Sequence, residues 1–317
     1  DSEMVLSRIC ANNVAKPEGT ITYTQMLNSK GGIECDVTVA RLSQDEYYIV
    51  SGTGFRTHTD SWIRNQLYST EKIELKDITE EWAAFSLMGP LSRNVLSKIT
   101  SSDLQNEVLP FGTCRTIEIN GHSVLALRIT YVGELGWELH MPRSSAESVY
   151  EALMNAGKKN GIVNAGYLAI ESMRLEKGYR EWGTEITSDN TPFEAGLGWA
   201  VKINSGTEFT GREALLYKQK YPLKKMLACF TIDDPEVVLL GRETIIRNGE
   251  VAGWLSSGGW GYTVGKNIGY GYVRHPDGVD REFLNSGSYE LEVATARYDC
   301  TLHSGPLYDP GMIQVKQ

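Results

Sequence analysis

Two hydrophobic periods alternate along the first two-thirds of the chain. Residues 146–160 place Val149, Leu153 and Ala156 on one helical face. Other stretches alternate at every second position, as strands do, and Asn120-Gly121 between two of them predicts a tight hairpin. The predicted helices are 2–9, 59–68, 91–99, 146–160 and 166–177, and the predicted strands are 21–27, 34–42, 47–51, 83–88, 115–119, 124–129 and 137–141.

The pattern changes after about residue 215. Short strand-like runs follow one another between glycine-rich turns, and Asn248-Gly249 predicts a second tight hairpin. The runs are 226–233, 244–247, 250–255, 268–273 and 288–293. They indicate a small β-barrel or sandwich without helices. We therefore predict an α+β protein with two domains, 1–217 and 218–317, divided at the lysine-rich segment 218–225.

Composition and charge narrow the class of protein. Of the 317 residues, 41% are hydrophobic and 22% are charged, as in ordinary globular proteins. The net charge of −9 argues against nucleic acid or an anionic membrane surface as partners. No apolar run approaches the roughly 18–20 residues that a membrane span needs. The five cysteines and five histidines are scattered without metal-ligand spacing, so we expect free thiols, packing or surface histidines, and no metal site.

Asp36 interrupts an apolar strand, GIECDVTVARL. Alternation places Cys35 and Val37 on one face, with Glu34 and Asp36 on the other. Strands are poor in aspartate, and a buried carboxylate needs a partner. The pattern is compatible with a solvated face or with a functional acid.

Two further blocks concentrate carboxylates, aromatics and glycines. In TYVGELGWE, glycines flank Glu134, and Glu138 follows Trp137, which suits a flat ligand with neighbouring N–H donors but also an ordinary hairpin. The block ESMRLEKGYREWG predicts a helix that ends at Gly178, and surface ion pairs would explain its charges equally well. GxGxxG, P-loop, HExxH and GxSxG motifs are absent, and the glycine-rich GGWG at 258–261 is expected to form a turn or bulge.

Taken in order, the blocks resemble the folate-dependent aminomethyltransferase family, which includes the glycine-cleavage T-protein and the C-terminal halves of dimethylglycine and sarcosine dehydrogenases. The resemblance rests on TYTQMLNSKGGIECDVTVARL, YVGELGWELHMP, VNAGYLAIESMRLEKGYREWG, PFEAGLGW, FTGREAL and RNGEVAGWLSSG. GELGWELH, RLEKGYREW and the closing GPLYDP are most similar to the sarcosine dehydrogenase branch.

The resemblance implies a fold, a cofactor and site residues. The fold would be a cloverleaf of α+β subdomains around a central cavity that holds tetrahydrofolate, followed by a small β-barrel. Asp36 would hold or withdraw a proton, with its desolvation offset by nearby donors, and Glu138 would accept the N–H groups of the pterin edge. Tyr131 would line the pocket, Arg174 would meet a folate carboxylate or support the acid, and Trp199 would pack on the ring. Weaker candidates are Tyr179, Trp182, Lys224 and Lys225.

Two departures bear on the biological role. Family members begin further upstream than Asp1, so the N-terminal part of the first domain is expected to be missing, and the dehydrogenases carry a preceding FAD-binding domain that this sequence lacks. The implied partners are folate, an iminium derived from an N-methyl amine and the protein's own FAD domain, in the mitochondrial matrix or, in a bacterium, the cytoplasm. A T-protein acting on a lipoyl carrier and a catalytically silent regulatory relative remain alternatives.

Overall fold

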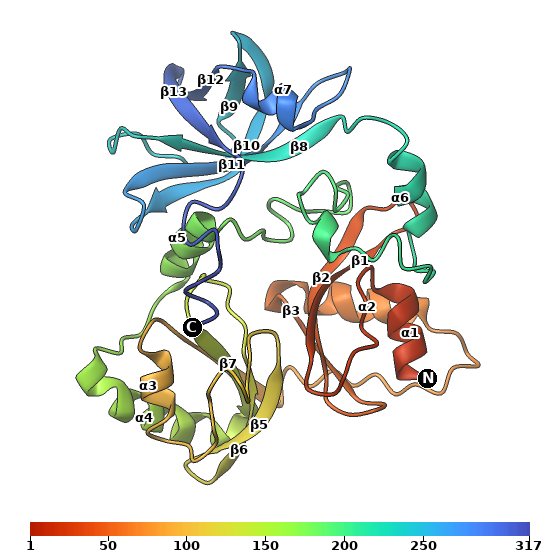
Figure 1. Ribbon diagram of the computed structural model, residues 1–317, viewed down its shortest axis with the longest axis vertical. Coiled ribbons are helices and arrows are strands. Elements are labelled where there is room, and N and C mark those ends of the chain that lie inside the picture. Colours follow the sequence, from red (N-terminus) through yellow and green to blue (C-terminus); the bar gives the residue numbers. More distant parts are fainter.

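The computed structural model describes residues 1–317, in which two small sheets and a barrel meet around one connecting segment (Figure 1). The helices are α1 (Ser2–Ile9), α2 (Arg56–Gln66), α3 (Ser92–Leu96), α4 (Ala146–Gly157), α5 (Tyr167–Lys177), α6 (Arg212–Lys218) and α7 (Arg281–Asn285). None of them combines the length and the hydrophobicity that crossing a membrane requires.

The first sheet is antiparallel, with β1 (Ile21–Leu27), β2 (Ile33–Arg41) and β3 (Tyr47–Ser51) in that order. In β2, Cys35 and Val37 are buried in a core shared with α1 and α2, whereas Glu34 and Asp36 on the opposite face are partly exposed. The predicted division of this strand into two faces is confirmed. The core therefore fixes the direction in which Asp36 points.

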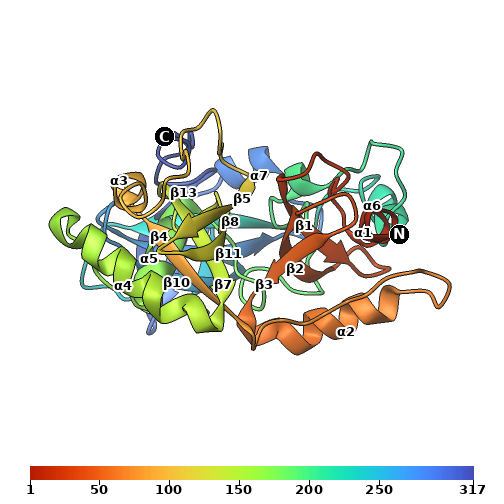
Figure 2. The same cartoon turned by 90° about the horizontal axis from the view of Figure 1, so that it is seen from below.

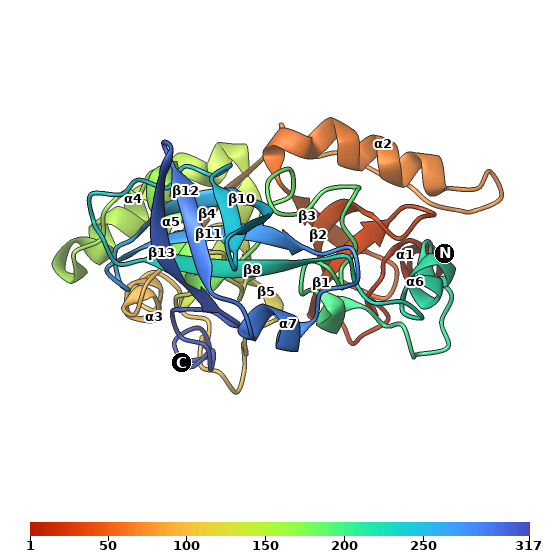
Figure 3. The same ribbon diagram turned by 90° about the horizontal axis from the view of Figure 1, so that it is seen from above.

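The second sheet has the order β4-β7-β6-β5, formed by β4 (Trp82–Met88), β5 (Cys114–Ile119), β6 (His122–Leu127) and β7 (Gly136–Pro142). Asn120 and Gly121 both have positive φ, 49° and 77°, and close the predicted hairpin between β5 and β6. Trp137 is fully buried in a core that includes residues of α4. Views from below and from above place α4 beside this sheet and α2 beside the first one (Figures 2 and 3).

The C-terminal region closes into a six-stranded barrel with the order β10-β11-β8-β13-β12-β9. Its strands are β8 (Lys225–Ile232), β9 (Thr244–Arg247), β10 (Glu250–Gly261), β11 (Lys266–Arg274), β12 (Tyr289–Val293) and β13 (Ala296–His303). The predicted α+β class with a C-terminal β-barrel is confirmed. The expectation of a region without helices is wrong, because Asp280 caps the short helix α7 by accepting a hydrogen bond from the backbone N–H of Phe283.

The expected turn at 258–261 is also wrong, because these residues belong to strand β10. Their glycines make room for α5, which packs on the barrel at this point. A Cβ atom added to Gly259 would lie 3.0 Å from Leu175 Cδ1. The register of β10 against β11 shifts between Leu255 and Ser257. The irregularity of the strand therefore lies just before residues 258–261 and not within them.

The segment after α5 joins all three units. The Trp182 indole N–H donates to the Ile33 carbonyl of β2 at 2.9 Å. On the barrel side, the Tyr272 hydroxyl donates to the Glu185 carbonyl at 2.8 Å. Tyr131 follows strand β6 of the second sheet, and its hydroxyl donates to the Arg180 carbonyl at 3.3 Å. Residues 180–185 therefore connect the elements that carry the predicted site.

Candidate active site

Asp36 lies opposite Gln25 in the register of β1 and β2, so both side chains leave the same face of the sheet. The Gln25 side-chain amide donates to Asp36 Oδ1 at 2.9 Å. Gln25 is fully buried, and the oxygen of its side-chain amide, Oε1, has no hydrogen-bond partner. The acid is thus held by a side chain that the surrounding sheet keeps in place.

Burial raises the pKa of Asp36 from 3.8 to about 6. Hydrogen bonds from Gln25 and Tyr23 and the charge of Arg180 lower this pKa, but they offset only part of the effect of burial. The expectation that nearby donors would compensate the desolvation is therefore met in part. A carboxylate with a pKa near 6 can take up and release a proton close to neutral pH.

Trp199 lies in a short 3-10 turn from Gly198 to Ala200. Its ring stacks on Tyr23, with ring centres 5.7 Å apart and an angle of 27° between the planes. Trp199 is 71% exposed, which is unusual for so large an apolar side chain. The structure thus brings Trp199 and Asp36 together through Tyr23, a residue that the sequence did not single out.

Tyr131 and Tyr179 form a second aromatic pair, with ring centres 6.1 Å apart and planes 15° from parallel. Burial raises the pKa of Tyr131 well above its ordinary value and that of Tyr179 to about 12, so both hydroxyls stay protonated.

Arg180 joins this pair to the acid. Its carbonyl accepts the Tyr131 hydroxyl, its guanidinium donates to the carbonyls of Ala195 and Gly178, and its charge acts on Asp36. Arg180 belongs to the GYREW stretch, and the sequence pattern did not indicate a functional role for it. Its position two residues after the helix-ending Gly178 was the only available indication.

Glu138 lies on β7, in the second sheet, and is partly exposed. One of its oxygens, Oε2, is 3.3 Å from His140 Nε2, and the other has no hydrogen-bond partner in the protein. No arginine or lysine pairs with it. The side chain can therefore accept hydrogen bonds from a ligand, although no hydrogen bond links it to Asp36.

Arg174 does not present its guanidinium to solvent. The side chain is 1% exposed and pairs with Glu185 at 2.7 Å and with Glu171 at 2.9 Å. Glu181 lies 3.7 Å away. Because its donors are used inside the protein, Arg174 is a poor partner for a folate carboxylate. The ion pair with Glu171 is present, but the arginine in it is buried and does not lie on the surface. The arginine instead anchors α5 to the segment that carries Arg180 and Glu185.

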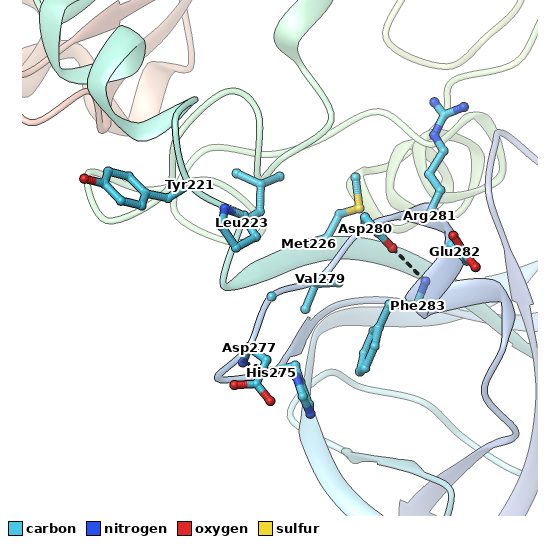
Figure 4. Close-up of a pocket in the computed structure, with 12 residues that line it drawn as sticks. Tyr221, Leu223, Met226, His275, Asp277, Val279, Asp280, Arg281, Glu282 and Phe283 are labelled. Atoms are coloured by element: carbon cyan, nitrogen blue, oxygen red, sulfur yellow. Dashed lines mark hydrogen bonds between the residues drawn. The ribbon is translucent and has the colours of Figure 1, made fainter.

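The weaker candidates have internal partners. Trp182 packs between Phe55 and His58, with ring centres 4.6 and 5.1 Å away. Lys224 and Lys225 donate to the carbonyls of Pro276 and Asp189. A groove of about 800 Å³ runs along the barrel edge between residues 221–226 and 275–283 (Figure 4). None of the predicted site residues lines it.

All five cysteines are free, as expected, and no cluster of three or more histidine, cysteine, aspartate or glutamate side chains is placed to bind a metal ion.

Comparison of this chain with models of known protein families shows the family to which it belongs. Residues 1–205 match the GCVT N-terminal domain, and residues 225–309 match the glycine cleavage T-protein C-terminal barrel domain. The first match alone covers more than half of the chain. The chain therefore belongs to the glycine cleavage T-protein family, which confirms the resemblance seen in the sequence.

Individual relatives come from both branches of this family. The chain is 39% identical over 332 residues to mitochondrial sarcosine dehydrogenase of Mus musculus, an alignment that covers 100% of this chain and 36% of that protein. It is 36% identical over 280 residues to the aminomethyltransferase of Halothermothrix orenii, covering 88% and 77%. The chain thus spans about a third of the length of the dehydrogenase.

A solved structure shares the fold. The glycine cleavage system aminomethyltransferase T of Bartonella henselae superposes with a TM-score of 0.81 over 96% of this chain and 81% of that one, at 24% identity. The arrangement of sheets and barrel is therefore that of a T-protein.

Proposed function

We propose that this chain is the tetrahydrofolate-dependent one-carbon transfer module of a sarcosine dehydrogenase-like flavoenzyme. The observation that carries the proposal is the desolvated Asp36, which is hydrogen-bonded by Gln25, has a pKa of about 6 and is linked through Tyr23 to the exposed ring of Trp199. The similarity to sarcosine dehydrogenase supports the assignment to that branch. The residues we assign to the site are Asp36, Tyr131, Glu138 and Trp199, with Arg180 added and Arg174 as their support.

The donors and acceptors of the site fit a reduced folate. Glu138 has a carboxylate oxygen without a protein donor, which suits the adjacent N–H groups of a pterin edge. Trp199 offers an exposed aromatic face for a flat ring. A reduced folate supplies nucleophilic nitrogens, and the proposed product is 5,10-methylenetetrahydrofolate.

Asp36 serves this chemistry as base and then as acid. When a folate nitrogen attacks the carbon of a cationic iminium, a C–N bond forms and the ionised carboxylate accepts the proton that the nitrogen loses. Its negative charge also stabilises the cationic carbon before attack. The protonated acid then returns the proton to the amine nitrogen, the C–N bond to the amine breaks, and the neutral amine leaves. As the second folate nitrogen bonds to the same carbon, the ionised Asp36 accepts the proton that this nitrogen loses.

Oxidation of the amine is assigned to a separate FAD-containing domain of the parent protein, so N-demethylation of sarcosine to glycine would need both parts. The name of the mouse relative places that enzyme in mitochondria. We propose the mitochondrial matrix for a eukaryotic parent and the cytoplasm for a bacterial one.

The test titrates this chain with tetrahydrofolate by calorimetry under anaerobic conditions. We expect saturable binding that Glu138→Gln weakens roughly tenfold or more, because a neutral amide cannot accept both N–H groups. Asp36→Asn should keep binding but abolish methylenetetrahydrofolate formation in the intact native protein. The wild-type transfer rate should rise with pH through about 6 as Asp36 ionises. Unchanged transfer in Asp36→Asn would remove its proposed role.

A T-protein acting on an aminomethyl-lipoyl carrier is the second candidate, and the long match to an aminomethyltransferase favours it. Such a carrier needs a docking surface on this chain, and that surface is usually basic. The net charge of −9 disfavours a basic docking surface. Intact-mass analysis of the native protein separates the two. A mass far above 35.2 kDa supports the flavoenzyme, and a mass near it supports a free-standing transferase. Repeated failure of the intact protein to bind folate would favour a silent regulatory relative.

A further inference from the structure

His140 is enclosed between two polar groups of the site. It lies on β7 two residues after Glu138, so both side chains share one face of the strand. His140 Nε2 is 3.3 Å from Glu138 Oε2, and His140 Nδ1 is 3.0 Å from the Tyr48 hydroxyl. The residue is only 4% exposed. The expectation that all histidines are surface or simple packing residues therefore misses this one.

One neutral tautomer of the ring satisfies both contacts. If Nε2 carries the proton, it donates to the Glu138 carboxylate, and Nδ1 accepts the hydroxyl proton of Tyr48. The other neutral tautomer would turn a nitrogen lone pair toward a carboxylate oxygen, which is unfavourable. Burial and the charge of Glu138 raise the pKa of Tyr48 to about 12, so its hydroxyl remains available as a donor.

The ring is held from both sheets. Tyr48 belongs to β3 of the first sheet, whereas His140 and Glu138 belong to β7 of the second. The Tyr48 and His140 rings meet edge to face, with centres 5.4 Å apart and planes at 82°. The ring of Trp82, on β4, also packs against Tyr48, with ring centres 5.8 Å apart. This packing leaves the imidazole little freedom to turn away from the carboxylate.

We propose that Tyr48 and His140 form a hydrogen-bond chain that positions the Glu138 carboxylate for its ligand. The proposal rests on the proposed function, in which Glu138 reads the donor edge of a folate. Because His140 binds only Oε2, the other oxygen stays free and its direction is fixed. His140 is a positioning residue, and the chain favours ligands that present N–H donors over ligands that present acceptors.

The first measurement is the tautomer of His140. Nitrogen-15 spectra of the labelled protein should show a protonated Nε2 and an unprotonated Nδ1, with the resonance assigned by its loss in His140→Gln. Tyr48→Phe should shift the Nδ1 resonance, because its donor is gone. A doubly protonated ring or an Nδ1–H tautomer in the wild type would overturn the proposal.

The second measurement is the affinity for tetrahydrofolate. His140→Leu should weaken binding roughly tenfold, the loss expected for one hydrogen bond to a charged group. His140→Gln, whose amide can still donate, should recover most of the affinity, and His122→Gln at the β5–β6 hairpin is the control. Tyr48→Phe should weaken binding in the wild type but not in the His140→Leu background.

The outcomes separate this proposal from the proposed function. If the wild type binds folate and His140→Leu binds equally well, the positioning role is wrong and the folate function stands. If neither wild type nor variants bind folate in the intact protein, the function itself fails. If His140→Leu does not fold, the Tyr48→Phe titration and the tautomer decide.

Discussion

Asp36 lies in a setting that stability alone would not select. Its folded-state pKa of about 6 lies above the ordinary 3.8, so the folded protein binds the proton more tightly than the unfolded chain does. The contribution of this group is most favourable below about pH 4 and is lost as the pH rises through 6. An acid kept at a cost in stability is typical of a site selected for reactivity.

This linkage predicts that Asp36→Asn stabilises the protein at pH 7.5. Two pKa units correspond to about 3 kcal/mol, and partial solvent access reduces this to about 1–3 kcal/mol. The asparagine oxygen can still accept the hydrogen bond from Gln25. Urea denaturation at pH 4 and pH 7.5 measures the effect, and the gain should be present only at the higher pH. A variant less stable than the wild type at pH 7.5 would contradict the pKa argument.

At the scale of elements, α5 decides where the site residues lie. Its Arg174 is fixed by Glu185, which is itself 1% exposed and also accepts a hydrogen bond from Ser257 of the barrel. Tyr179 and Arg180 follow within six residues of Arg174. The ion pair thus holds the end of the helix and the start of the site segment against β10.

Arg174→Ala should therefore lower the free energy of unfolding by about 3–5 kcal/mol, because it leaves Glu185 buried without a counter-charge. The matched control is Arg64→Ala in α2. Arg64 forms an i,i+4 pair with Asp60 but is 49% exposed, so its loss should lower the free energy of unfolding far less. Urea midpoints of the two variants provide the comparison. Equal effects would show that the buried pair contributes no more than a surface one.

Elements governed by local pattern could be predicted from the sequence, and those governed by distant contacts could not. The alternation in β2 predicted the face of Asp36, and Asn120-Gly121 predicted its hairpin. The predicted strand 250–255 ended too early, since β10 continues to Gly261. Its glycines serve the packing of α5, a contact between residues about 85 positions apart that local pattern does not show. The site residues Tyr23, Arg180 and His140 were missed for the same reason, because their roles depend on partners in other elements.

At the scale of the whole molecule, the C-terminal segment ties the barrel to the second sheet. After β13 the chain passes α5, where the backbone N–H groups of Leu307 and Tyr308 donate to the Glu176 carbonyl. Figure 1 shows this segment descending from the barrel toward β7. The Tyr308 hydroxyl donates to Glu134 at 2.6 Å, and Arg128 donates to the carbonyl of Val315. The GPLYDP block thus contacts the blocks that contain Glu134 and Glu176.

Lys177 and Asp309 are the centre of this connection. Their side chains are 2% and 5% exposed and lie 2.8 Å apart, and Lys177 also donates to the Asp309 carbonyl at 2.7 Å. Gly133 packs directly on the lysine. It has a φ of +78°, and an added Cβ would lie 2.8 Å from Lys177 Cδ. The loop that carries Tyr131 therefore rests on a lysine that the C-terminal segment holds in place.

Asp309→Ala should release this contact and leave the Lys177 ammonium buried without its counter-charge, at a cost of about 3–5 kcal/mol. Hydrogen exchange should increase in residues 131–136 and 304–317 more than in the barrel strands, because the loop loses its support while the barrel core is untouched. Asp299→Ala, an exposed barrel residue without an ion pair, is the control and should change neither region. If exchange rose only in 304–317, the segment would be a passive tail, and the Tyr131 loop would be ordered by the second sheet alone.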